Sequence, residues 1–252
     1  MNDFNYGILK EVAHRPWPMP AIPWIMTQTW LDVLFAHWAV EPGLMRARVP
    51  EELELDLFAG RAWLGIVPFR MSNVAPRALP ALPKMSAFPE VNVRTYVRVG
   101  DKAGVFFFSL DATNPVAVGI AKTMFGLPYF VASMQVAAEN GGIRYSSRRT
   151  APRAPAAELV ASYHPVGDVF QPSPGSLEHF LTERYCLYTV DDDRRTFSLE
   201  IHHPPWPLQP AEASFDVLRM TEQVGLSLPS TEPVLHYAKR QDVVAFPMRR
   251  VD

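Results

Sequence analysis

The stretch from Glu90 to Val99 alternates strictly between two kinds of side chain. Successive residues of a β-strand point to opposite faces, and β-branched residues favour strands, so this stretch predicts a strand with two different faces. One face is apolar and consists of Val91, Val93, Thr95, Val97 and Val99. The other face is polar and consists of Glu90, Asn92, Arg94, Tyr96 and Arg98. The apolar face predicts contact with a hydrophobic core.

The polar face of this strand allows two interpretations. Antiparallel sheets often expose one face to water, and a row of polar side chains suits such a face. In the second interpretation, the row lies inside a barrel or cleft and binds a small ligand. Asn92 and Tyr96 favour this second interpretation, because a solubilising surface is richer in Lys and Glu.

Proline is unusually frequent in this chain, with 25 in 252 residues, against an average usage of about 5%. Proline is excluded from helix interiors and is common at strand ends, sheet edges and turns. The sequence therefore predicts a mainly β protein (β-rich α+β) with a few short helices. Prolines between residues 16 and 23 predict that residues 1–24 form an extended N-terminal arm, which Trp17 and Trp24 would anchor.

Alternation, apolar runs and turn residues place further elements along the chain. We expect strands at 26–40, 53–58, 61–71, 105–111, 129–138, 143–147, 158–163, 185–190, 196–203, 215–219 and 235–246. We expect a helix that Glu41-Pro42 opens and residues 44–49 complete, with Pro42 near its first turn. We expect two more helices, at 116–124 with Asn114 as N-cap and at 176–184 with Ser176 as N-cap. The strands at 53–58 and 61–71 are expected to form a hairpin, and residues 72–89 a long loop of the kind that covers binding sites.

Charge and composition exclude several classes of protein. The net charge of −2 gives no electrostatic basis for binding nucleic acid. No apolar run approaches the ~18 residues that cross a membrane, and residues 1–5 lack the features of a signal peptide, so we expect a cytoplasmic location. The single cysteine, Cys186, is expected to be a buried thiol. His202 and His203 lack a third ligand at a recognisable spacing, so no metal site is expected.

A pattern of residues spread over most of the chain carries a resemblance to a known family. The pattern consists of Gln28-x-Trp30, Phe35-Ala36-His37-Trp38, Pro50, the strand from Glu90 to Val97, Phe107 to Ala112, and Leu127-Pro128-Tyr129. It resembles the YqjF-like family of uncharacterised bacterial proteins. Pro50 to Asp56 and Val116 to Gly119 are also similar to the acetoacetate decarboxylase fold. The resemblance implies a single β-barrel-like domain over residues 25–252, with flanking helices and an enclosed polar pocket.

Acetoacetate decarboxylases use a lysine as a Schiff-base nucleophile, and burial and a neighbouring lysine lower the pKa of this group. The resemblance places that lysine pair at Gly126-Leu127-Pro128-Tyr129, where this chain has no lysine. Lys122 lies earlier, on the expected helix, with no second lysine beside it. By the same comparison, Glu90 falls about where those enzymes carry a pocket carboxylate, and Trp63 about where they carry a second one. We therefore expect a pocket without Schiff-base chemistry.

Three functions remain open on this basis. In the first, an enzyme acts on a small organic carboxylate or carbonyl compound, with Arg94 holding the anionic group and Glu90 as acid or base. His37, more often a structural histidine in such a position, is a reserve base. The remaining substrate-binding candidates are Asn92, Tyr96 and Tyr129. In the second function, the same residues bind a ligand without catalysis. In the third, Glu90 and Arg94 form a structural buried ion pair. None of the three functions requires a metal or cofactor. The sequence leaves the oligomeric state open.

Overall fold

The structure is a computed structural model that describes residues 3–79, 86–139 and 141–251. Within these residues, a 13-stranded sheet dominates, and the α-helices beside it are short. The predicted fold class, a mainly β protein with a few short helices, is therefore confirmed. No helix in the described part of the chain is long and apolar enough to span a membrane.

The strands and helices have the following bounds. The strands are β1 (Met26–Val40), β2 (Glu54–Leu55), β3 (Ala62–Pro76), β4 (Phe88–Val99), β5 (Lys102–Ala112), β6 (Tyr129–Glu139), β7 (Gly142–Arg149), β8 (Glu158–Pro165), β9 (Cys186–Val190), β10 (Thr196–His202), β11 (Gln209–Leu218), β12 (Val234–Ala245) and β13 (Arg249–Val251). The helices are α1 (Pro42–Arg46), α2 (Pro115–Phe125) and α3 (Leu177–Thr182), with 3-10 turns at Tyr6–Lys10 and Glu222–Val224.

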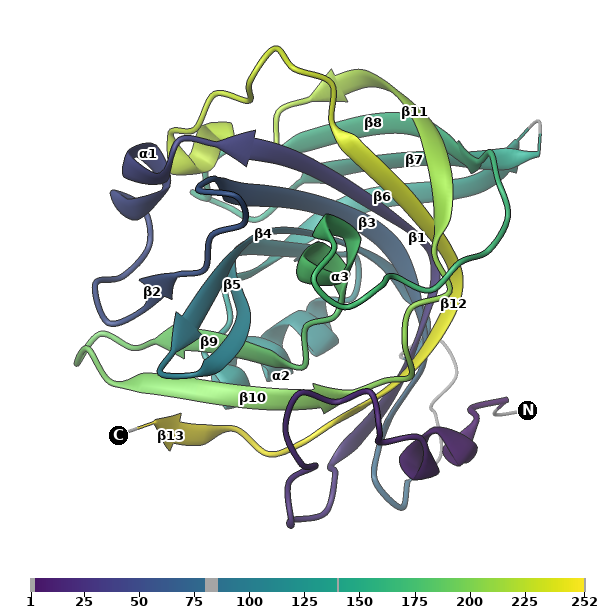
Figure 1. Ribbon diagram of the computed structural model, residues 1–252. Helices are drawn as coiled ribbons and strands as arrows, with labels where there is room; N and C mark the ends of the chain where they lie inside the picture. The colour runs from purple at the N-terminus through teal and green to yellow at the C-terminus, as the bar shows by residue number, and fades with distance from the viewer. Residues whose placement is uncertain (1–2, 80–85, 140, 252) are drawn as a thin grey trace.

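The sheet closes on itself in two places (Figure 1). Pairing runs from β4 through β5, β6, β7, β8, β11, β12, β1 and β3 back to β4, which makes a closed barrel. A second closure joins β5 to β9 and β10 to β12. The strands β12, β1, β3, β4 and β5 therefore belong to both closures. Together with β9 and β10 they form what we call the second ring, whose added strands lie below the shared ones in Figure 1.

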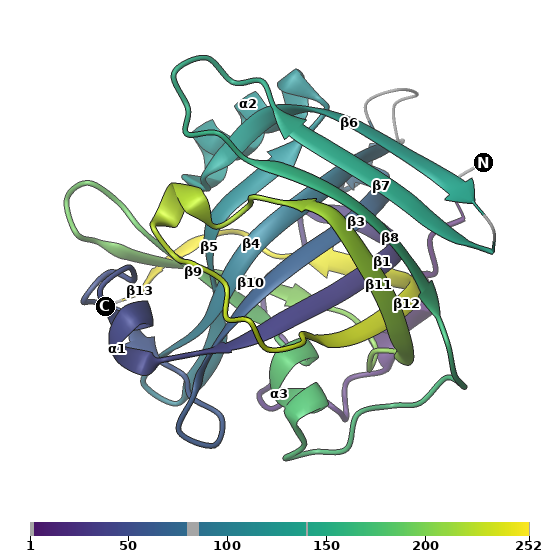
Figure 2. The ribbon, with the colours of Figure 1, turned by 90° about the horizontal axis from the view of Figure 1, so that it is seen from above.

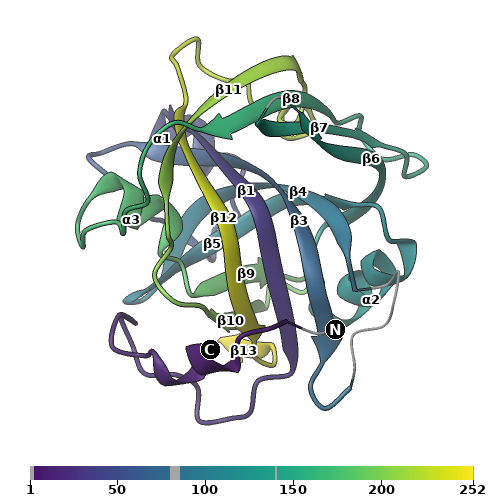
Figure 3. The ribbon, with the colours of Figure 1, turned by 90° about the vertical axis from the view of Figure 1, so that its right-hand side faces the viewer.

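Two helices lie at opposite ends of the shared strands. Figures 2 and 3 both place α2 at one end and α3 at the other. The predicted N-cap of α2 is confirmed, because Asn114 Oδ1 accepts a hydrogen bond from the Val116 amide at 3.1 Å. The predicted N-cap of α3 is also confirmed, because Ser176 Oγ accepts from the His179 amide at 3.2 Å. These caps fix the first turns of both helices against the ends of the second ring.

The two faces of β4 point into different interiors. Its valines pack in the barrel core, together with Tyr145 and Leu159 from β7 and β8. Its polar side chains point to the opposite face, toward β9 and β10. The predicted contact of the apolar face with a core is confirmed, and the polar face is covered by the second ring.

Gly104 allows the second ring to close. A Cβ atom at this position would lie 2.7 Å from the Cys186 carbonyl oxygen and 2.7 Å from the Tyr188 ring, closer than real Cβ contacts come. Because glycine has no Cβ, β5 and β9 can approach closely enough to pair at Val105 and Leu187.

Several predicted elements need correction. Residues 53–58 and 61–71 do not form a hairpin: β2 pairs with β4, and only a bridge from Phe58 to Arg61 joins the two stretches.

The predicted loop at 72–89 is shorter, because β3 continues to Pro76 and β4 begins at Phe88. Hydrogen bonds of the Thr27 hydroxyl to backbone oxygens near Asn73 hold this extension of β3. The centre of that loop, residues 80–85, lies outside the described residues.

Two predicted helices are also shorter than expected. The first helix begins at Pro42, as expected, but ends at Arg46 instead of Val49, and that at 176–184 spans Leu177–Thr182. In the N-terminal segment, Tyr6–Lys10 forms a 3-10 turn, and Trp24 packs with Phe4 and Phe246 as an apolar anchor. The division into an arm and a single domain stays a prediction.

Candidate functional site

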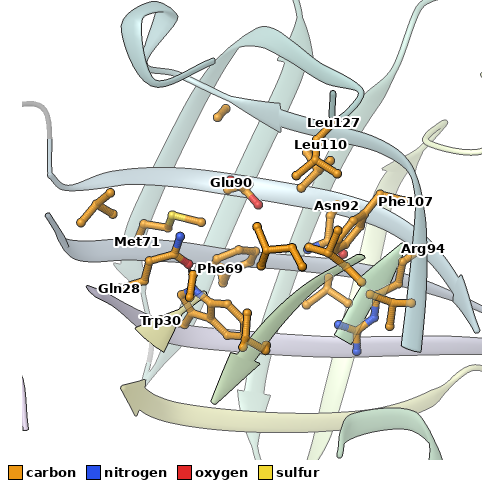
Figure 4. A pocket seen from close by; sticks show the side chains of 18 of the residues that line it. Gln28, Trp30, Phe69, Met71, Glu90, Asn92, Arg94, Phe107, Leu110 and Leu127 are labelled. Carbon is orange, nitrogen blue, oxygen red and sulfur yellow. The ribbon is translucent and has the colours of Figure 1, made fainter. Parts of the chain in front are cut away.

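The second ring encloses a cavity of about 430 Å³. Each strand of the ring contributes side chains to its wall, and α2 and α3 contribute at the ends. Most of this wall is apolar, as Figure 4 shows around the labelled side chains. Cavities of this size and character typically bind small organic molecules through a few well-placed polar groups.

Glu90, Asn92 and Arg94 form a polar stripe along this wall (Figure 4). Their neighbours across the sheet are apolar or small, and are Phe69 and Ala112 beside Glu90, Val67 and Leu110 beside Asn92, and Gly65 and Phe107 beside Arg94. The three polar residues are 2%, 5% and 8% exposed, respectively. The polar face of β4 is therefore enclosed and not open to water. Buried polar groups are costly without partners, so the partners of each decide what the stripe can do.

Glu90 is paired with Tyr129, whose hydroxyl donates to Glu90 Oε2 at 3.0 Å. The pKa of the Glu90 carboxyl is raised to about 8, mainly by burial. The Tyr129 hydrogen bond opposes this rise, and the nearby Asp111 carboxylate adds to it. At neutral pH this carboxyl group is therefore mainly protonated. It can donate a proton or a hydrogen bond into the cavity.

Arg94 is a buried cation without a carboxylate partner among the described residues. Its Nη2 donates to the Leu181 carbonyl at 3.1 Å and to the Tyr96 hydroxyl at 3.5 Å. Its Nε has no hydrogen-bond partner, and the guanidinium carbon lies 5.4 Å from the centre of the Phe35 ring. Arginine stays charged in proteins, so this site has positive charge to offer to an anion.

Arg184, a second arginine in the cavity wall, shows the contrast. Its Nη1 donates to Asp56 Oδ2 at 2.5 Å, and its Nε donates to the Phe180 carbonyl at 2.6 Å. A carboxylate of the protein therefore compensates the charge of Arg184, whereas Arg94 has only neutral partners among the described residues, namely the Leu181 carbonyl, the Tyr96 hydroxyl and aromatic rings.

Glu90 and Arg94 do not form an ion pair in the described structure. Glu90 is bonded to Tyr129 and Arg94 to Leu181. The two residues stand four positions apart on one strand, which separates their Cα atoms by about 13 Å at the usual rise per residue. Glu90 is bonded to the first residue of β6, whereas Arg94 is bonded to α3. The hypothesis of a structural Glu90–Arg94 ion pair is therefore wrong for this arrangement.

Asn92 lies between these two ends of the stripe (Figure 4). Its Oδ1 is buried and has no hydrogen-bond partner in the described structure. An unsatisfied buried amide oxygen costs free energy, so a ligand donor beside it would be favourable.

Tyr96 and His37 lie behind the wall and do not border the cavity. The Tyr96 hydroxyl donates to the Leu181 carbonyl at 2.7 Å and lies 2.7 Å from His37 Nε2. Burial lowers the pKa of His37 well below its usual value, and the Arg94 and His236 charges lower it further. A neutral, fully buried histidine cannot reach a ligand in the cavity. The structure thus gives both residues a supporting position beside Arg94 and α3.

The sequence analysis did not propose four polar residues of the described wall as site residues, which are Gln28, Thr182, Arg184 and His203. Thr182 ends α3, Arg184 follows α3 and His203 follows β10. These three residues reach the cavity because β9 and β10 pair with β5 and β12. A sequence pattern shows each of these strands but not the pairing between them. Cys186 also borders the cavity, and its predicted burial is confirmed at 2% exposure.

The described part of the cavity wall contains no lysine. Lys122 is exposed on α2, with its Nζ 5.1 Å from the centre of the Phe130 ring. Lys84 lies outside the described residues. Burial raises the pKa of the Cys186 thiol to about 12, so this group is protonated at neutral pH and is a poor nucleophile.

The chain matches a family model, and it is similar to a protein sequence and to solved structures. The model of DUF2071, a family of uncharacterised conserved proteins, matches residues 27–242. The uncharacterised protein YqjF of Bacillus subtilis (strain 168) is 46% identical over 227 residues, covering 90% of this chain and 93% of its own.

Solved structures of low sequence identity share the fold. The enduracididine biosynthesis enzyme MppR complexed with pyruvate is similar with a TM-score of 0.63 and 13% identity, over 95% of this chain and 93% of that one. An acetoacetate decarboxylase is similar with a TM-score of 0.61 and 11% identity, over 98% of each chain. These similarities confirm the acetoacetate-decarboxylase-like barrel that the sequence pattern implied.

Proposed function

This chain belongs to the DUF2071 family, and on that premise we propose that it binds a small organic carboxylate or carbonyl compound in the cavity of the second ring. Arg94 holds the anionic group of the ligand in this proposal. Asn92 and the Glu90–Tyr129 pair form hydrogen bonds with its other polar atoms.

The observation that carries the proposal is the uncompensated charge of Arg94 beside an apolar cavity. A buried charge is costly unless an opposite charge or several hydrogen bonds compensate it. A guanidinium group binds carboxylates through two parallel hydrogen bonds, which suits a ligand of this class. MppR, a protein of the same fold, has been solved in complex with pyruvate, a small carbonyl carboxylate.

Glu90 supplies the acid of the proposed site. Its pKa of about 8 leaves the carboxyl protonated at neutral pH, and the Tyr129 hydroxyl fixes its orientation. A protonated carboxyl beside a ligand carbonyl would donate a hydrogen bond to the carbonyl oxygen and polarise that group. Such a site could support proton transfer next to a carbonyl without any covalent intermediate.

A second candidate function is ligand binding without catalysis. The position of His37 favours it, because the reserve base lies behind the cavity wall and is bonded to Tyr96. The protonated state of Cys186 favours it as well, since this thiol is not an activated nucleophile. Turnover of a bound keto acid, measured by NMR, would decide for the enzyme.

Titration calorimetry with pyruvate and levulinate tests the proposal. Arg94→Met should weaken the binding of both by about tenfold to a hundredfold, because hydrogen bonds to charged groups contribute about 1.5–3 kcal/mol. Arg98→Met is the matched control: Arg98 lies on the same strand and the same face, outside the cavity, and bonds to the Gly100 carbonyl. Equal binding by wild type and Arg94→Met would contradict the proposed role of Arg94.

The absence of Schiff-base chemistry is tested separately. Borohydride reduction in the presence of pyruvate or acetoacetate, followed by intact mass measurement, should leave the protein unmodified. A stable adduct would overturn this expectation, and peptide mapping would then assign it to Lys122, Lys84 or another lysine.

A further inference from the structure

We infer that the ligand of this cavity is an elongated oxo-carboxylate, with its single negative charge at Arg94, an apolar chain along the polar stripe and a distant carbonyl at Glu90 and Tyr129. This inference rests on the proposed function and goes further, because it specifies the length of the ligand and the separation of its two polar groups. Three features of the cavity support it.

The first feature is the distribution of charge along the cavity. Arg94 is an uncompensated cation near α3, while Asp56 already neutralises Arg184. The other end of the stripe presents Glu90, which is protonated at neutral pH. A ligand with one negative charge suits this arrangement, whereas a second carboxylate at the Glu90 end would meet a second acid and no cation.

The second feature is the distance between the two polar ends. Glu90 and Arg94 are separated by about 13 Å along β4. In pyruvate the carbonyl is bonded directly to the carboxylate carbon, so one molecule cannot reach both ends. A carbonyl that accepts from Glu90 therefore belongs to a longer molecule whose carboxylate lies at Arg94.

The third feature is the apolar wall between the ends. Val67 and Leu110 flank the middle of the stripe, and Phe69 and Phe107 follow on either side. Such a wall gains about 0.8 kcal/mol for each methylene that it removes from water, which corresponds to about a fourfold gain in affinity. A methylene chain passing this wall would therefore add affinity at each step, and Asn92 is the residue of the stripe that it passes between the ends.

A ligand series on the wild-type protein tests the inference. Titration calorimetry would use methyl-ketone carboxylates of increasing length, from pyruvate through levulinate to a decanoate with a terminal methyl ketone, with plain decanoate for comparison. We expect affinity to rise by about fourfold per methylene until the ketone reaches Glu90. The ketone should then bind about threefold or more tightly than plain decanoate, and this advantage should vanish above the pKa of Glu90, where the donor is lost.

Arg94→Met and Arg94→Lys separate this inference from the proposed function. If affinity rises with length and both variants weaken the whole series, with Arg94→Lys retaining more binding, the inference holds. If pyruvate binds as tightly as the longest acid and Arg94→Met abolishes both, the proposed function stands and the inference is overturned. If no member of the series binds, or if long chains bind independently of Arg94, the proposed function is overturned as well.

Discussion

The Tyr129 hydroxyl donates a hydrogen bond to Glu90 Oε2 at 3.0 Å, and this bond joins β6 to β4. Glu90 lies on β4, which is shared by the barrel and the second ring, while Tyr129 begins β6 of the barrel. The bond holds a protonated carboxyl at one end of the polar stripe, with the uncompensated charge of Arg94 at the other end. The consequences for stability and binding follow from this arrangement.

The stability that Glu90 contributes should be lost as the pH rises from about 4.5 to about 8. The pKa of Glu90 is raised from 4.5 to about 8, so the folded state binds more protons than the unfolded state in this range. The contribution is complete below pH 4.5 and is lost as the pH rises through 8. Within this range the Glu90 contribution to the free energy of unfolding should fall by about 1.4 kcal/mol for each pH unit. The lowered pKa values of His37, His202, His203 and His236 act in the opposite direction, so this contribution is the difference between wild type and Glu90→Gln. Urea unfolding at several pH values measures it.

Glu90→Gln should remove this part of the pH dependence, because glutamine does not titrate. Glu232→Gln, at an exposed position, serves as the control and should leave the dependence unchanged. An identical slope in wild type and Glu90→Gln would mean that Glu90 is ionised in the folded protein.

Tyr129→Phe should raise the pKa of Glu90 above 8. The Tyr129 hydrogen bond stabilises the ionised carboxylate, so its loss leaves burial and the Asp111 charge to act unopposed. The pH range over which stability falls should therefore extend upward. Tyr145→Phe is the matched control, because the Tyr145 hydroxyl donates to the backbone oxygen of Glu90 at 2.7 Å and not to its carboxyl. Equal titration ranges in both variants would refute the role of Tyr129.

Arg94→Met and Arg184→Met should change stability in opposite directions. Arg94 has no carboxylate partner among the described residues, so its replacement relieves desolvation and should leave the free energy of unfolding unchanged or raise it. Arg184 pairs with Asp56, which is one-fifth exposed, so its replacement should destabilise toward the lower end of the usual ~3–5 kcal/mol for a broken buried pair. Thermal and urea unfolding compare the two variants. A large loss of stability in Arg94→Met would show that Arg94 has a structural role.

Gly65→Ala should displace Arg94 and weaken ligand binding. A Cβ at Gly65 would lie 3.0 Å from the His37 ring and 3.3 Å from Arg94 Cγ, so both side chains would have to shift. Overpacking of this kind costs about 1–3 kcal/mol of stability. Gly43→Ala, which would meet no atom within 4 Å, is the control. Unchanged stability and affinity in Gly65→Ala would mean that the Arg94 position is not constrained from this side.

The sequence predicted the central strand and its two faces because strand periodicity is a local property. The valines of β4 and its polar residues needed only the alternation of residues 90–99 to be assigned to opposite faces. The caps Asn114 and Ser176 were predictable for the same reason, since capping depends on neighbouring residues. The burial of the polar face was open, because it depends on which strands cover it.

The parts that the sequence did not predict depend on pairing between distant strands. The partner of β2 is β4, and no local signal distinguishes that pairing from a hairpin with the next strand. At Asp32, where φ is 51°, β1 has an irregular register that brings both Trp30 and Val33 to the cavity wall. An inserted residue reverses the alternation, so that odd-numbered instead of even-numbered residues of β1 face the cavity. A prediction that assumes strict alternation misses this change.

A crystal structure of the protein with a bound keto acid tests the proposed role of Arg94 most directly. We predict density for the ligand inside the second ring, with its carboxylate oxygens within about 3 Å of the Arg94 guanidinium nitrogens. Density for the ligand away from this cavity, or inside it with the carboxylate directed away from Arg94, would contradict that role.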